Sequence, residues 1–332
     1  MKCTNNILLK RLPVYISLIG SIFLTGCGVN NYDMPYSSDY PVSSYRMDVL
    51  GSNTASAVPF ASDLCVVGQD VTENTDVDMS KASAAGLFSL DTNETFYAKN
   101  VHEKLAPASL TKVMTALVAL KYGSPDQVLT ASANVKIKES GAQLCGLKEG
   151  DKMTLDQALH IMLINSANDA AILIAEGIGG SVEGFAEMMN KEAKAIGATN
   201  SNFVNPNGLN ADNHYVTAYD MYLIFNEACR SYDLFKQIIL MPEYSTTYTD
   251  KDGKSKEISV KSTNLYVRGD EASPNSITVI GGKTGTTSVA GHCLILLSKD
   301  SNGKSYISVI LRSEAAEILY SEMTDLLTEI KN

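Results

Sequence analysis

Residues 106–117 read Ala-Pro-Ala-Ser-Leu-Thr-Lys-Val-Met-Thr-Ala-Leu. Pro107 holds the residue before it in an extended conformation, and the run from Ser109 to Leu120 contains no helix breaker, which predicts a helix. Residues three apart on a helix share a face, so the Ser109 hydroxyl and the Lys112 amine can meet. A serine becomes a nucleophile only beside a base, and lysine can be that base when desolvation, a nearby positive charge or the helix dipole lowers its pKa. The alternative is a capping serine followed by a solvated lysine.

A second polar pair, Ser166 and Asn168, follows an apolar helix that is predicted to begin at a Thr154–Gln157 capping box and to end at Ile164. A hydroxyl and a carboxamide at this spacing suit a proton relay and a hydrogen bond to a substrate. Taken alone, the pair is more typical of a cap for the next helix.

A third motif spans residues 281–286 and reads Gly-Gly-Lys-Thr-Gly-Thr. It follows a β-branched run, which predicts that it occupies the C-terminal half of a strand. The flanking glycines let another backbone or a ligand approach closely. An ammonium beside a hydroxyl can bind a carboxylate, and a second positive charge near Lys112 would lower the pKa of that lysine. A Gly-rich edge strand with an exposed lysine is the alternative.

The three motifs begin at residues 109, 166 and 283, in the order found in class A β-lactamases and penicillin-binding proteins. Each also falls on the element it needs, namely a helix start, a loop between helices and a strand. More of the chain, roughly residues 80–312, resembles the serine D-alanyl-D-alanine carboxypeptidases, which are low-molecular-mass penicillin-binding proteins. The stretches that carry this resemblance are 106–117, 168–171, 203–209, 214–220 and 283–294.

The resemblance implies a serine hydrolase that needs no cofactor or metal. Ser109 would attack the penultimate D-Ala carbonyl of a peptidoglycan stem peptide and expel the terminal D-Ala. Lys112 would take the serine proton, and Ser166 would help pass it to the departing amine. Backbone N–H groups of Ser109 and Thr286 would form the oxyanion hole, and water would then release the acyl group. Penicillin and other β-lactams would acylate the same serine and leave slowly.

The substrate-binding residues implied by the resemblance are Asn168, Lys283, Thr284, Gly285 and Thr286. Asn168 would bond the peptide backbone of the substrate, while Lys283 and Thr284 would bind its terminal carboxylate. Some relatives add an arginine shortly after the last strand. This chain has no clear equivalent, because Arg312 lies only nearby and Glu317 and Leu319 stand at the expected places.

The same resemblance implies an α/β (α+β) fold of the serine β-lactamase/transpeptidase type, in which helices and an inserted helical lobe flank an antiparallel sheet. The sequence itself predicts a hairpin from Ala85–Leu90 and Thr95–Lys99, because a polar turn separates the two runs. The other predicted strands span 277–280, 294–297 and 306–311, and the other predicted helices span 168–176, 181–195, 217–228 and 314–330.

The first residues resemble a bacterial lipoprotein signal. Lys2, Lys10 and Arg11 precede an apolar run that ends in Leu-Thr-Gly before Cys27, the expected site of lipidation. Two acyl chains on Cys27 would hold the protein at the outer face of the cytoplasmic membrane. We therefore expect a signal peptide over 1–26, a flexible tether over 27–62 and a catalytic domain over 63–332.

Composition limits the other possibilities. The chain of 332 residues has 27 basic and 37 acidic side chains, a net charge of −10, which argues against a nucleic-acid partner. Its four histidines form no zinc-type pair, and Cys65, Cys145, Cys229 and Cys293 are spaced like small buried hydrophobes rather than disulfide partners. We expect a monomer.

Three alternatives on the same fold remain. A β-lactamase would need a Glu-x-x-x-Asn loop to activate water, and residues 200–213 contain no Glu. A D,D-endopeptidase or transpeptidase would use Ser109 with another amine as leaving group or acceptor. A non-catalytic wall-binding or β-lactam-sensing lipoprotein would keep only the pocket. His214 and His292 are interpreted as structural, because Lys112 already supplies a base.

Overall fold

The computed structural model describes residues 62–73 and 75–330 of the chain, within the unit Ala61–Asn332. The predicted signal peptide, the lipidation site Cys27 and all of the predicted tether except its last residue lie outside the described residues. Within the part that is described, no helix is long and apolar enough to cross a membrane.

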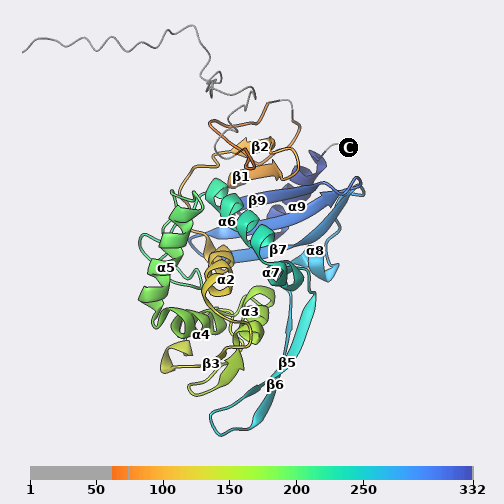
Figure 1. Cartoon of the computed structure of the whole chain (residues 1–332). Helices are drawn as coiled ribbons and strands as arrows, with labels where there is room; N and C mark the ends of the chain where they lie inside the picture. Colours follow the sequence, from red (N-terminus) through yellow and green to blue (C-terminus); the bar gives the residue numbers. More distant parts are fainter. Residues whose placement is uncertain (1–61, 74, 331–332) are drawn as a thin grey trace, which may run out of the picture. The chain divides into compact units, whose positions relative to one another are not determined.

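A five-stranded antiparallel sheet in the order β2-β1-β9-β8-β7 lies at the centre of the domain (Figure 1). Its strands are β1 (Ala82–Ser89), β2 (Thr95–Lys99), β7 (Ile277–Thr287), β8 (Gly291–Asp300) and β9 (Ser305–Ser313). Ala85 of β1 stands opposite Ile310 of β9, so the N-terminal hairpin pairs with the C-terminal strands. The prediction that segments from both ends of the domain close one sheet is confirmed.

Both faces of this sheet are covered. Successive side chains of a strand point to opposite faces. Ile295 and Leu297 of β8 therefore pack into the core shared with the helical lobe, whereas Leu294 and Leu296 pack on the other side, where α9 (Ala316–Thr328) lies. Burial on both faces explains why the strand reads as a continuous apolar run and not as an alternating one.

The helical lobe is inserted between β2 and β7, as predicted. It consists of α2 (Thr111–Tyr122), α3 (Leu155–Ile164), α4 (Asn168–Gly179), α5 (Val182–Ala195), α6 (Ala218–Ser231) and α7 (Asp233–Ile239). Helix α2 contacts α3, α4, α5 and α6, and its first nine residues are all buried. The capping box at the start of α3 is present, with Thr154 accepting from the Gln157 N–H and Gln157 accepting in return.

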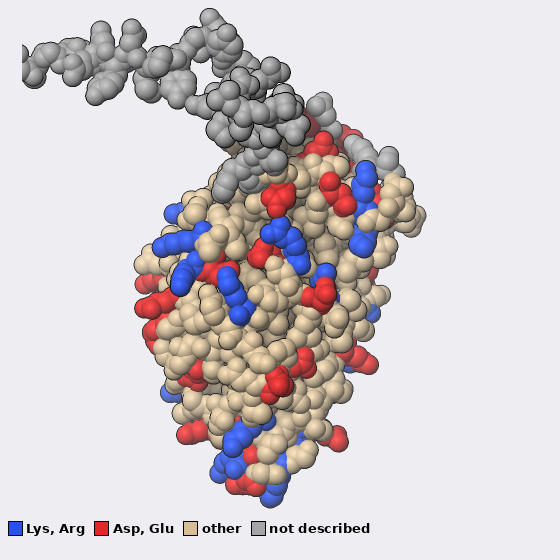
Figure 2. All heavy atoms as spheres, viewed as in Figure 1, with Lys and Arg blue, Asp and Glu red and all other residues tan. Residues whose placement is uncertain are grey.

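The structure contains a second sheet that was not predicted. Its strands are β3 (Val128–Thr130), β4 (Lys152–Thr154), β5 (Glu243–Thr249) and β6 (Ser255–Lys261), in that order. The β5–β6 hairpin reads Glu-Tyr-Ser-Thr-Thr-Tyr-Thr and Ser-Lys-Glu-Ile-Ser-Val-Lys. Its apolar residues, Tyr244 and Tyr248 in β5 and Ile258 and Val260 in β6, alternate with polar ones, but with two in each strand they give only a short signal. In Figure 1 this hairpin extends away from the central sheet. Figure 2 shows one face of the molecule, on which basic and acidic side chains are mixed.

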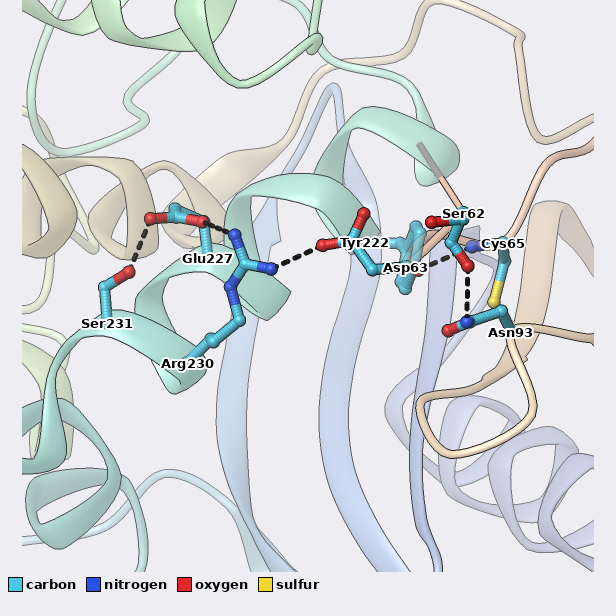
Figure 3. Close-up of polar contacts among 8 residues, drawn as sticks. All are labelled: Ser62, Asp63, Cys65, Asn93, Tyr222, Glu227, Arg230 and Ser231. Carbon is cyan, nitrogen blue, oxygen red and sulfur yellow. Dashed lines mark hydrogen bonds and ion pairs between the residues drawn. The ribbon is translucent and has the colours of Figure 1, made fainter. Parts of the chain in front are cut away.

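The start of the described chain is fixed to α6 and to the β1–β2 turn (Figure 3). Asp63 pairs with Arg230 at 2.7 Å, and the Tyr222 hydroxyl accepts from the Cys65 N–H at 3.0 Å. Asn93 donates to the Ser62 carbonyl at 2.8 Å. The chain therefore enters the domain beside β1 and β2, at the edge of the sheet opposite to β7.

The four cysteines of the described part are free thiols, and Cys65, Cys229 and Cys293 are buried. Burial raises the pKa of Cys229 and of Cys293 to about 12, so both stay protonated at neutral pH.

Candidate active site

The predicted nucleophile Ser109 lies in a short 3-10 turn, Ala108–Leu110, that leads into α2. The helix was predicted to begin at Ser109, and the α-helix begins two residues later, at Thr111. Ala108 has a φ of 47°, a conformation that costs a residue with a side chain about 1 kcal/mol or more. The strained turn presents the half-buried Ser109 side chain to a cleft.

Lys112 is fully buried, which excludes the solvated-lysine alternative. Its Nζ atom lies 2.8 Å from Ser109 Oγ, 2.8 Å from Asn168 Oδ1 and 2.6 Å from the Asn207 carbonyl oxygen. Burial lowers the pKa of Lys112 well below its usual value, the Lys283 charge lowers it further, and Asp169 opposes both. A neutral amine has two N–H groups and one lone pair. The two fixed oxygens can take the N–H groups, which leaves the lone pair for the Ser109 hydroxyl.

Lys283 reaches the same site from β7 and is also buried. Its Nζ donates to Ser166 Oγ at 2.9 Å and to its neighbour's carbonyl, that of Thr284, at 2.8 Å. Burial lowers the pKa of Lys283 to about 7. Ser166 itself has a φ of 65°, which places its hydroxyl between α3 and α4 and within reach of the ammonium.

Asn168 joins the nucleophile's base to the rim of the cleft. Its Oδ1 accepts from Lys112, while its Nδ2 donates to the Gln143 carbonyl at 3.0 Å. The backbone N–H of Asn168 donates to that same carbonyl at 2.8 Å. One N–H of the carboxamide is then left for the substrate backbone, which is the role the resemblance implies for Asn168.

Strand β7 passes close to the nucleophile because of its glycines. A Cβ atom on Gly285 would stand 2.9 Å from the Ser109 nitrogen, and one on Gly282 would stand 2.1 Å from the Ile295 oxygen. A larger residue at Gly285 would push β7 away from Ser109, and one at Gly282 would push it away from β8. The Thr284 and Thr286 hydroxyls line the cleft, and Thr284 Oγ1 bonds Thr263 Oγ1 at 2.5 Å.

The cleft has a volume of about 590 Å³ and is lined by Ser109, Ser166, Asn168 and the β7 motif. Among the described residues that line it there is no Lys or Arg. Arg312 is exposed and does not line the cleft, whereas Leu319 does. Among the described residues, no cluster of His, Cys, Asp and Glu could hold a metal ion.

The eight residues predicted for catalysis and substrate binding thus lie together, and some of their partners were not predicted. The Asn207 carbonyl, which binds Lys112, acts through the backbone, so its residue type gave no signal. Asp169 lies in the stretch 168–171 that carries the family resemblance, but no role was predicted for its side chain. Its buried carboxylate accepts from the N–H groups of Cys145, Gly146 and Leu147, and so holds the chain next to the rim residues 139–143.

Known proteins are similar to this chain over most of the described residues. A family model described as D-alanyl-D-alanine carboxypeptidase (Peptidase S11) matches residues 70–315. The chain is 32% identical over 253 residues to the D-alanyl-D-alanine carboxypeptidase DacF of Bacillus subtilis, a match that covers 74% of this chain and 61% of DacF. It is 27% identical to the D-alanyl-D-alanine endopeptidase of Escherichia coli, covering 78% of this chain and 80% of that protein.

Among solved structures, the DD-transpeptidase of Streptomyces K15 is similar, with a TM-score of 0.69 and 25% identity over 75% of this chain and 96% of that one. The chain therefore has the fold of the penicillin-binding DD-peptidases. The chain belongs to the D-alanyl-D-alanine carboxypeptidase family. It spans 61% of the length of DacF and 56% of that of DacC of Escherichia coli.

Proposed function

We propose that this chain is a serine D-alanyl-D-alanine carboxypeptidase that trims the terminal D-Ala from peptidoglycan stem peptides. The observation that carries the proposal is the hydrogen bond of 2.8 Å between a fully buried Lys112 and Ser109. Burial lowers the pKa of Lys112 well below its usual value, which favours the neutral amine that can accept the serine proton. Family membership supports the reaction and the substrate class.

In the proposed reaction, Ser109 Oγ attacks the carbonyl carbon of the penultimate D-Ala, and its proton passes to Lys112. Lys112, Ser166 and Lys283 then form the path by which the departing amine of D-Ala receives a proton. The ammonium of Lys283 holds Ser166 Oγ at 2.9 Å, which keeps this hydroxyl in the path. Water next hydrolyses the ester on Ser109 and regenerates the serine.

The terminal carboxylate of the substrate would lie against Thr284 and Thr286, whose hydroxyls line the cleft. Lys283, whose Nζ donates to Ser166 Oγ and to the Thr284 carbonyl, would supply the positive charge. β-Lactams present a carboxylate and a strained acyl group in the same arrangement, so they would acylate Ser109. Glu139 is the one carboxylate among the described lining residues, and it is exposed. We therefore expect slow release of penicillin and no efficient β-lactamase activity.

An endopeptidase or transpeptidase reaction is the second candidate. The lining of the cleft favours such a reaction. It includes Thr263, Leu265 and Tyr320, and there is no Lys or Arg among the described lining residues. Such a surface does not single out a free carboxylate. The similarity to a D-alanyl-D-alanine endopeptidase over 80% of its length also supports this candidate.

We also propose that Cys27 is lipidated and that residues 27–62 tether the domain to the outer face of the cytoplasmic membrane. Five strands set about 4.8 Å apart would separate the chain's entry beside β1 and β2 from the cleft beside β7 by roughly 20 Å. The described chain thus begins at the edge of the sheet opposite to the cleft. Metabolic labelling with a clickable fatty acid should mark the chain and not its Cys27→Ala variant; equal labelling would contradict lipidation.

The enzymatic proposal is tested by D-alanine release from a peptide that ends in D-Ala-D-Ala, with the full chain in detergent beside Ser109→Ala. We expect release by the wild type and none by the variant. Cleavage of a cross-linked dimeric stem peptide, without release from the monomeric peptide, would favour the endopeptidase. Folded protein that cleaves neither peptide would contradict the enzymatic proposal and favour the sensor.

A further inference from the structure

Three hydrogen bonds run in one direction toward the peptide bond that precedes the nucleophile. The Val204 N–H donates to His214 Nδ1 at 3.1 Å, and His214 Nε2 lies 2.8 Å from Thr111 Oγ1. Thr111 Oγ1 in turn donates to the Ala108 carbonyl oxygen at 2.9 Å. All of these groups except Val204 are buried.

The proton positions along this chain follow from the partners. Thr111 has one hydroxyl proton and donates it to the Ala108 carbonyl oxygen. Its oxygen must therefore accept from His214, which places the proton of the imidazole on Nε2. Nδ1 is then free to accept from Val204, as the geometry requires. Burial lowers the pKa of His214 to about 4, so the ring is neutral at physiological pH and the chain of donors is intact.

The Ala108 carbonyl belongs to the same planar unit as the Ser109 N–H. In a trans peptide the C=O and N–H point in opposite directions, so whatever fixes the one fixes the other. The Ala108 carbonyl oxygen points into the protein, where it accepts from Thr111 and packs against Gly208. A Cβ atom on Gly208 would stand 1.8 Å from that oxygen. The Ser109 N–H therefore faces the other way, toward Gly285 and the cleft.

We propose that His214 and Thr111 are positioning residues that orient the Ala108–Ser109 peptide, so that the Ser109 N–H serves as an oxyanion donor. The inference rests on the proposed serine-peptidase function. It also explains how the left-handed conformation of Ala108 is maintained, since the carbonyl is bonded only while the peptide keeps this orientation.

The test compares Thr111→Val, which removes the donor, with Thr111→Ser, which restores it. Thr115→Val is the matched control, because Thr115 is equally buried one turn further along α2 and donates to the Pro206 carbonyl at 2.6 Å, not to the Ala108 carbonyl. Each full-length variant is assayed with a D-Ala-D-lactate ester and with its thionoester, in which sulfur replaces the attacked oxygen. Sulfur is a poor acceptor in an oxyanion hole, so the ratio of the two rates reports on the donor.

We expect Thr111→Val to lose about tenfold to hundredfold in acylation by the oxygen ester, part of the loss seen when an oxyanion donor is removed. The oxygen-to-sulfur ratio should fall in Thr111→Val and stay near that of the wild type in Thr111→Ser and Thr115→Val. If Thr111→Val does not fold, His214→Phe takes its place, and its ratio should fall in the same direction.

A wild-type ratio in Thr111→Val or His214→Phe, despite lower thermal stability, overturns this inference and leaves the proposed function intact. The same holds if Thr115→Val lowers the ratio as much as Thr111→Val, because the effect would then be one of packing. Wild-type protein that neither ester acylates overturns the proposed function, and this inference with it.

Discussion

The amine nitrogen of Lys112 lies 2.8 Å from the hydroxyl oxygen of Ser109, and the whole lysine side chain is shielded from solvent. Water therefore cannot solvate an ammonium at this position, and Lys283 adds a second charge that repels it. The remaining contacts of Lys112, to Asn168 and Asn207, are with oxygens that a neutral amine satisfies equally well. The site is built to hold a base beside the nucleophile.

Lys112→Arg should abolish most of the activity even though a basic residue is kept at this position. Arginine stays protonated in proteins and cannot accept a proton from Ser109. We expect acylation by penicillin to slow by roughly 100-fold to 10,000-fold, the usual contribution of a general base. Stopped-flow acylation rates measure this, and a loss of less than tenfold would show that Lys112 is not the base.

Substrate binding should weaken as the pH rises above about 7. The pKa of Lys283 is lowered to about 7, so its ammonium is present below this pH and is lost above it. The carboxylate of the substrate then loses its attraction, and KM for a D-Ala-D-Ala peptide should rise between pH 7 and 9. A substrate with an amidated C-terminus is the control, because its KM should not follow the same curve.

The same shift predicts a pH-dependent stability. Unfolded Lys283 binds its proton up to about pH 10.4, whereas the folded side chain releases it near 7. Since the unfolded state binds more protons between these values, stability rises with pH, by up to about 1.4 kcal/mol per pH unit. The free energy of unfolding in urea should therefore rise more for the wild type than for Lys283→Met between pH 7 and pH 9. A constant difference would contradict the assigned pKa.

Gly208→Ala should destabilise the domain strongly. Gly208 has a φ of 84°, and an added Cβ would stand 1.8 Å from the Ala108 oxygen. We expect a cost of roughly 3–5 kcal/mol, at the upper end for single substitutions. Gly253→Ala is the control, because Gly253 has a similar φ of 80° with nothing within 4 Å of the added atom. It should cost about 1 kcal/mol, the backbone penalty alone, and equal losses would show that the contact with Ala108 is unimportant.

Asp169→Asn should loosen the rim of the cleft. One amide oxygen cannot replace a carboxylate that accepts from the N–H groups of Cys145, Gly146 and Leu147. Removal of this charge also takes away the influence that raises the pKa of Lys112. We expect faster hydrogen exchange at residues 145–147 and an acid limb of the acylation profile that moves to lower pH. An acid limb that moves to higher pH would contradict this electrostatic role.

The sequence predicted what depends on local chemistry. Local patterns of a few residues could be recognised in the sequence. They are the Thr154–Gln157 capping box, the hairpin at the start of the domain and the Ser109–Lys112 pair. The glycines of residues 281–286 likewise predicted a close backbone approach, and Gly285 packs against Ser109.

Contacts made through the backbone or between polar strands could not be predicted. The Asn207 carbonyl binds Lys112 across 95 residues without using a side chain. The β5–β6 hairpin is held mainly by its own ladder and exposes most of its side chains. Each of its strands has only two apolar residues on the inner face, so hydrophobic patterning gives a weak signal for it. His214 was interpreted as structural, and only its partners in the fold indicate that it also positions Ser109.

The most direct test of the account is the mass of the protein after brief incubation with benzylpenicillin, followed by peptide mapping. The account predicts that one benzylpenicilloyl group is added and that it maps to Ser109. Ser109→Ala, which keeps the buried Lys112, should gain no mass. Labelling at another residue, or equal labelling of the variant, would contradict the assignment of Ser109 as the nucleophile.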